Sequence, residues 1–80
     1  MIMSETKGPE ANLVRMANQM ADYFEAFPEA EAAPGVADHI RKFWTPKMRA
    51  EFIKFGEAHP TDLHRLAREA LVLLKQPPTT

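Results

Sequence analysis

At the centre of this chain stands ADHIRKFWTPKMR, residues 37–49, which marks a sharp corner between two predicted helices. Thr45 is a good helix N-cap, and Pro46 at the first helical position gives up only an N–H that had no partner. Pro46 also disfavours helical backbone at Thr45, so the preceding helix should end near Trp44. The sequence therefore predicts two helices that meet at a Thr-Pro corner.

Helical periodicity extends from this corner toward the N-terminus. A first helix is predicted from Pro9 until Pro28 stops it, with one apolar stripe at helical spacing: Leu13, Met16, Ala17, Met20, Phe24 and Phe27. A second helix is predicted from about Pro34 to Trp44. Residues 29–33 could begin this helix, but Pro34 and the glycine after it interrupt the pattern.

Two further helices follow the corner. The third is predicted over residues 46–58, and the fourth from a Thr61 N-cap to a point before Pro77. Their inward-facing residues share helical spacing: Met48, Phe52, Phe55, Leu63, Leu66, Ala67, Ala70, Leu71 and Leu74. The fourth helix has the cleanest apolar stripe in the chain.

The predicted fold class is all-α, a small compact bundle of about four short helices with Pro-marked turns. No segment shows the alternating pattern of a strand. The expected organisation is a mobile N-terminal tail over residues 1–9, one helical domain over residues 10–75 and a C-terminal tail over residues 76–80.

Size and composition exclude several classes of function. Eighty residues allow one small domain, and a net charge of −1 gives no global attraction to nucleic acid or to an anionic membrane. The absence of Cys excludes disulfides and thiolate metal sites. No signal-peptide core and no long apolar run are present, so we expect a cytoplasmic protein. Four short helices leave little room for an enclosed pocket of the ~300 Å³ or more that a small-molecule site usually needs, which argues against an enzyme. We expect no small-molecule substrate.

No group of side chains in the sequence is typical of catalysis or of metal binding. The three histidines, His39, His59 and His64, have spacings that fit no helical ligand pair, and no H-E-x-x-H motif occurs. With one Tyr and no Cys, no nucleophile has a base near it in the sequence. We therefore interpret the histidines as structural or solvated and expect neither catalysis nor a cofactor nor a metal in this chain.

Charge is unevenly distributed along the sequence. Residues 16–40 contain five Asp and Glu and no Lys or Arg, whereas residues 41–54 contain five Lys and Arg and one Glu. Both segments could be solvated helix faces that also attract one another within the fold. Alternatively, they form a bipolar surface that orients the protein on a larger partner. Five cations beside an acidic half favour a protein partner over nucleic acid.

Trp44 has two interpretations that the sequence does not separate. With Phe43 it could anchor an exposed patch, since large aromatics beside Arg are typical of protein interfaces. In that case Trp44→Ala would abolish docking and leave a folded protein. It could equally be the central core residue at the corner, and then the same substitution would unfold the chain.

Three blocks of the sequence carry a family resemblance. They are LVRMANQMADYF (13–24), GVADHI (35–40) and FWTPKMR (43–49). Over roughly residues 13–74, the chain resembles the delta subunit of the soluble, molybdenum-containing, NAD-dependent formate dehydrogenases. Thr45 departs from the Asp expected at this position in the family, but both residues can cap a helix.

The resemblance implies a role without catalysis of its own. In this family the alpha subunit carries the molybdenum–pterin centre and iron–sulfur clusters and oxidises formate. The delta subunit would stabilise the complex or aid cofactor insertion, with the alpha subunit as its partner. The positions implied for partner contact are His39, Arg41, Lys42, Phe43, Trp44, Met48 and Arg49. Arg15 and Asn18 are weaker candidates.

Two other roles stay open at this point. One is a transient assembly chaperone that leaves the finished enzyme, and the other is a free-standing homo-oligomeric helical protein. Both would use the same kind of exposed anchor surface.

Overall fold

The computed structural model describes residues 9–76, and the predicted tails lie almost entirely outside this range. Five helical elements follow in order: α1 (Pro9–Phe24), α2 (Glu29–Phe43), α3 (Pro46–Ala58), the short 3-10 helix η1 (Pro60–Asp62) and α4 (Arg65–Lys75). No strand occurs between residues 9 and 76, and the all-α fold class is confirmed.

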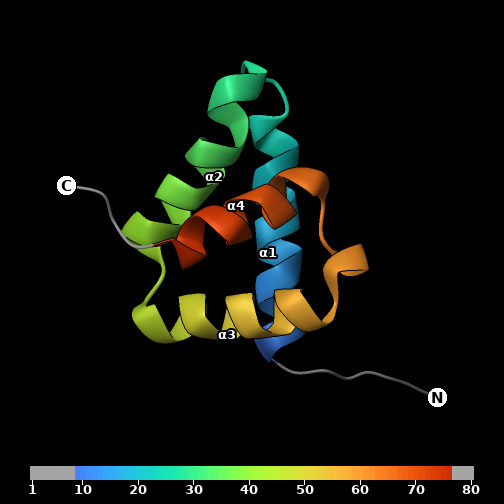
Figure 1. Ribbon diagram of the computed structural model, residues 1–80, viewed down its shortest axis with the longest axis vertical. Helices are drawn as coiled ribbons and strands as arrows, with labels where there is room; N and C mark the ends of the chain where they lie inside the picture. Colours follow the sequence, from blue (N-terminus) through green and yellow to red (C-terminus); the bar gives the residue numbers. More distant parts are fainter. Residues whose placement is uncertain (1–8, 77–80) are drawn as a thin grey trace.

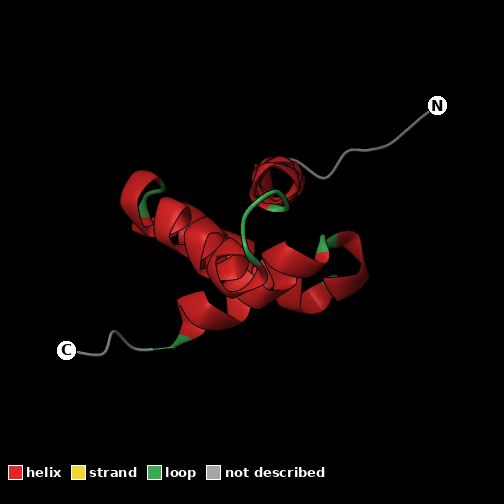
Figure 2. Cartoon of the chain, turned by 90° about the horizontal axis from the view of Figure 1, so that it is seen from above, coloured by secondary structure: helices red, strands yellow, loops and turns green. Residues whose placement is uncertain are grey.

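The four α-helices form two hairpins that cross. Figure 1 shows α1 rising and α2 descending beside it, while α3 crosses below them and α4 runs back across the middle in the opposite direction to α3. Seen from above, α1 appears end-on, to one side of the other helices (Figure 2). Helix α4 packs against each of the other three α-helices, so it closes the core.

The core is built from a few large side chains set among many alanines. Its largest fully buried members are Phe52, Ile40, Leu66 and Val36. The buried alanines come from three helices: Ala17, Ala21, Ala32, Ala33, Ala37, Ala67 and Ala70. Small residues at these positions allow the helix backbones to approach closely, and the amphipathic stripe of α4 covers the space between them.

The Thr-Pro corner has the predicted geometry. The Thr45 hydroxyl oxygen accepts a hydrogen bond from the Met48 N–H at 3.1 Å, and Pro46 is the first residue of α3. The Trp44 N–H donates to the Ile40 carbonyl at 2.9 Å, which completes the last turn of α2. Local chemistry therefore sets both helix ends, and the predicted bounds of α3 are confirmed.

The predicted start of the second helix is wrong, because α2 begins at Glu29 and continues through Pro34. The Pro28 carbonyl accepts from the N–H groups of Glu31 and Ala32 at 2.8 and 3.1 Å, which sets up the first turn before Pro34 is reached. Pro34 removes a hydrogen bond to the Ala30 carbonyl, but both residues are exposed and water can solvate that oxygen.

The first helix ends at Phe24, earlier than the sequence predicted. The Phe27 N–H donates to the Phe24 carbonyl at 3.0 Å in a tight turn, since Pro28 disfavours helical backbone at the residue before it. Phe27 therefore leaves the stripe of α1, although its ring stays 4.8 Å from that of Phe24.

The predicted N-cap of the fourth helix is wrong. The cap is His64 and not Thr61. The chain forms η1 after Pro60 and then extends through Leu63, whose side chain is buried. The His64 Nδ1 accepts from the Leu66 N–H at 3.0 Å, so α4 begins only at Arg65. Burial of Leu63 in the core decides this start, and no local pattern indicates it.

Candidate interaction surface

Three residues of the predicted contact region lie near the C-terminal end of α2, and we call them the corner surface: His39, Lys42 and Phe43. The Phe43 side chain is 70% exposed, and its ring packs against the His39 imidazole with 4.6 Å between ring centroids. Lys42 pairs with Asp38 one turn earlier at 3.1 Å. The corner surface thus presents a large apolar ring beside a cation.

Trp44 lies in the core, not on the corner surface. It is 7% exposed, and its ring meets that of Phe52 edge-to-face with 5.6 Å between centroids. Successive residues at a helix end point in different directions, so Phe43 faces outward when Trp44 faces inward. The core interpretation of Trp44 is therefore the one that the structure shows.

The two arginines of the predicted set both line an open hollow of about 450 Å³ in the surface. Arg41 donates from Nη2 to the Leu73 carbonyl at 2.7 Å, which joins the end of α2 to the end of α4. Arg49 is half-buried, and Met48 packs its partly buried side chain against the core. Met48 therefore contributes to core packing at the Thr-Pro corner.

Most ion pairs of the acidic segment join it to α4 and its N-cap, and not to the basic segment. Glu29 pairs with Arg65 at 2.8 Å, and Glu25 contacts His64 at 2.6 Å. Among the described residues, the ion pair of Lys42 with Asp38 is the one that joins the two segments. Near the corner, Lys42 and Lys47 have acidic partners, whereas Arg41 and Arg49 form no ion pair with a carboxylate of residues 11–76.

Asn18 has a structural role that accounts for its side chain. Its Nδ2 donates to the Asp62 carbonyl at 2.9 Å, and its Oδ1 accepts from the His64 N–H at 2.9 Å. The side chain thus fastens α1 to the connection that precedes α4. Arg15 is exposed on α1 and donates to Asn12.

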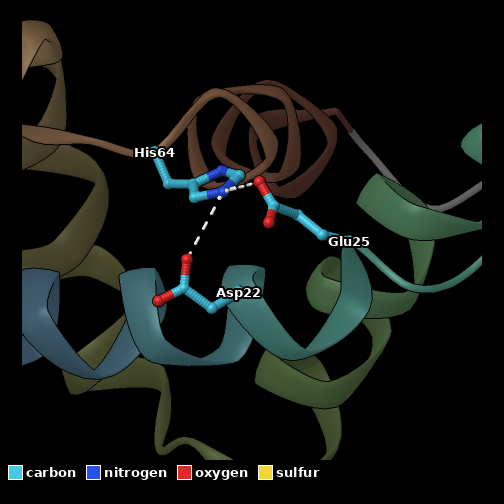
Figure 3. Close-up of side chains that lie close together, drawn as sticks. All are labelled: Asp22, Glu25 and His64. Carbon is cyan, nitrogen blue, oxygen red and sulfur yellow. Dashed lines mark hydrogen bonds and ion pairs between the residues drawn. The ribbon is translucent and has the colours of Figure 1, made fainter.

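Asp22, Glu25 and His64 form a polar cluster that the sequence did not reveal (Figure 3). The His64 Nε2 lies 2.6 Å from the Glu25 Oε2 and 3.6 Å from the Asp22 Oδ1. The two acids stand one turn apart at the end of α1, but the histidine follows about forty residues later. No pattern of such long range is visible in one sequence.

The hydrogen bonds of His64 argue against metal binding by this cluster. Nδ1 accepts from the Leu66 N–H, so the proton of the neutral ring sits on Nε2, which donates to Glu25. A metal at Nε2 would displace that proton to Nδ1, where it would face the Leu66 N–H and break the cap of α4. The three side chains hold α1 to α4 instead.

No helix within residues 9–76 combines the length and the apolar character needed to cross a bilayer.

A family model described as NADH-dependent formate dehydrogenase delta subunit FdsD matches residues 12–71. The chain belongs to this family. Searches of curated proteins and of solved structures give no significant match.

The matched range confirms the family resemblance seen in the sequence. In this delta subunit, it begins in the first turns of α1, contains the whole corner and ends within α4. The family is one of formate dehydrogenase subunits, so a place in that complex is what membership implies.

The ion pair of Glu29 with Arg65 gives a prediction for this delta subunit. Arg65 donates to both Glu29 oxygens, at 2.8 and 3.2 Å, and these hydrogen bonds hold the pKa of the Glu29 carboxyl below its usual range. In an NMR titration we expect the Glu29 midpoint to rise in Arg65→Met. Because the pKa of Glu29 is lowered in the folded state, its ion pair with Arg65 stabilises the fold at pH values above the unfolded-state pKa. This stabilisation is lost as the pH falls through the folded-state pKa. An unchanged midpoint would show that the pair does not persist in solution.

Proposed function

We propose that this chain is a non-catalytic delta subunit that docks on the alpha subunit of a cytoplasmic formate dehydrogenase through its corner surface. Its role there is to stabilise the complex or to aid insertion of the molybdenum cofactor. The family match supports the association with formate dehydrogenase. The choice of the alpha subunit and of the contact surface is the proposal.

The observation that carries the docking surface is the exposure of Phe43. An aromatic ring that is 70% exposed forgoes about 1–2 kcal/mol of the 1.5–3 kcal/mol that full burial of such a side chain gains. Aromatic rings with nearby cations are the residues that dominate binding energy at interfaces. The Phe43 ring packs against the His39 ring, which already restricts the Phe43 side chain, so docking would remove less conformational freedom from it.

The variant that tests this surface is Phe43→Ser. We expect the tagged wild-type chain, purified at mild salt from its native cytoplasm, to bring the alpha subunit with it in native mass spectrometry. Phe43→Ser should lose most of that subunit, while its circular dichroism stays that of a folded helical protein. The matched control is Val72→Ser, which changes another exposed apolar side chain, 55% exposed on α4, and should retain the alpha subunit.

The composition of the purified species separates the possible roles. One copy of this chain per catalytic unit in active enzyme supports a permanent subunit. Binding only to cofactor-free alpha subunit supports an assembly chaperone. Recovery of the chain alone, as monomer or homo-oligomer, contradicts the proposed docking. Equal loss of the alpha subunit from both serine variants would place the contact outside the corner surface.

A further inference from the structure

We propose that the hollow between Arg41 and Arg49 receives a segment of the partner protein that carries a carboxylate beside an apolar side chain. This inference deepens the proposed function and rests on it for the identity of the partner. We call this site the arginine hollow: Arg41, Pro46, Arg49, Ala50, Ile53, Leu74 and Gln76.

The arginine hollow has an apolar floor with cations at its rim. Ile53 from α3 and Leu74 from α4 are partly buried and pack against the core, while Ala50 is small and exposed. The volume of about 450 Å³ is enough for one or two side chains of a docked segment. Because three helices supply the walls, the shape of the hollow is set by the folded core.

Both arginines have donors to spare. Arg41 uses Nη2 on the Leu73 carbonyl, and neither Arg41 nor Arg49 forms an ion pair with any carboxylate of residues 11–76. Arg65, by contrast, pairs with two carboxylates of this chain. A guanidinium offers a planar fork of donors that matches a carboxylate, so an external acid is the complementary occupant.

The first turn of α3 adds to the positive potential at the hollow. It contains no acidic residue, whereas the first turn of α2 contains two. Lys47 and Arg49 instead sit near the positive end of the helix dipole, an unfavourable arrangement in the free chain. Lys47 has one carboxylate partner, Glu51, at 3.8 Å on the surface, where solvent screens the pair. An acid from a partner would offset this repulsion.

The occupant we favour is an acidic protein segment, not a polyanion. An extended polyphosphate backbone has no apolar side chain, so it would leave the Ile53 and Leu74 floor uncovered. In a segment with an Asp or Glu next to a Leu, Ile, Val or Phe, the carboxylate could pair with the arginines while the apolar side chain covers Ile53 and Leu74. Such a contact would lie beside the corner surface and extend it.

The first test measures the affinity of the full chain for formate dehydrogenase prepared without it. We expect Arg49→Glu to raise the Kd at least about 30-fold, since it removes a charge pair and adds a repulsion. The same variant should melt at the wild-type temperature or above, because an acid near the start of α3 suits the helix dipole. The matched control is Lys54→Glu, an equal charge change at an exposed α3 position outside the hollow, which should change the Kd about two-fold or less.

The outcomes of this test separate the two proposals. If the wild-type chain does not bind, the proposed function fails, and this inference fails with it. If the wild type binds and Arg49→Glu binds as tightly, the proposed function survives and the arginine hollow is not a contact. Equal weakening by Arg49→Glu and Lys54→Glu would indicate general charge attraction and would overturn the site.

The second test identifies the occupant by its chemistry. In an Arg49→Lys variant, a zero-length carbodiimide can join the new amine to a carboxylate that sits in the hollow. We expect mass spectrometry to find a partner peptide in which the coupled Asp or Glu adjoins a large apolar residue. Coupling of position 49 only to a second copy of this chain, only to a carboxylate of its own chain, or to nothing would overturn the inference.

Discussion

Trp44→Ala is expected to lower the free energy of unfolding by about 3–5 kcal/mol. The substitution empties a position that is 7% exposed and removes the edge-to-face contact with Phe52. A chain of this size has a total stability of only ~4–12 kcal/mol, so the variant should lose at least about a quarter of that total. Urea denaturation followed by circular dichroism at 222 nm measures the loss.

Two matched variants separate the core role of Trp44 from its neighbourhood. Trp44→Phe retains a ring against Phe52 and should cost less than half as much. Phe43→Ala changes the adjacent, exposed ring and should alter stability by no more than about 0.5 kcal/mol. If Trp44→Ala kept wild-type stability, Trp44 would not be a core residue, and the interpretation as a surface anchor would return.

Pro34→Ala is expected to stabilise the protein by about 2–2.6 kcal/mol. A proline inside a helix costs ~3 kcal/mol relative to alanine, and the alanine restores an N–H that can donate to the Ala30 carbonyl. Part of this gain is lost, because proline also restricts the unfolded chain by ~0.4–1 kcal/mol. The melting temperature should rise by roughly 8–20 °C, which differential scanning calorimetry measures.

Pro46→Ala is the matched control for that gain. Pro46 is the first residue of α3, where proline suits the backbone and no hydrogen bond is missing. The control should therefore be neutral or slightly destabilising. A neutral or destabilising Pro34→Ala would mean instead that the backbone conformation imposed by Pro34 is needed for the packing of α2 against α4.

The features that could be predicted from the sequence are those set by neighbouring residues. Thr45 and Pro46 specify the start of α3 through one side-chain hydrogen bond and one fixed dihedral angle, and both are local. The apolar stripe of α4 indicated its buried face, because helical spacing alone decides which residues share a face. The all-α fold class follows from such local patterns.

The features that could not be predicted depend on contacts between distant segments. Local propensity argues against a helix through Pro34, yet Ala32 and Ala33 are buried and their packing outweighs it. His64 replaces Thr61 as the cap because Leu63 is drawn into the core. The direction of Trp44 at its helix end is likewise set by Phe52, a residue of the next helix.

The place of α4 in chain order bears on how the protein is made. Synthesis from the end of α3 to the end of α4 takes roughly 1–3 s at ~5–20 residues per second, and until then the other helices lack the cover that α4 supplies. Leu73 and Leu74, from the last turn of α4, complete the surroundings of Arg41. A ribosome-bound or prematurely terminated chain without α4 therefore also lacks the arginine hollow, to which Leu74 and Gln76 contribute.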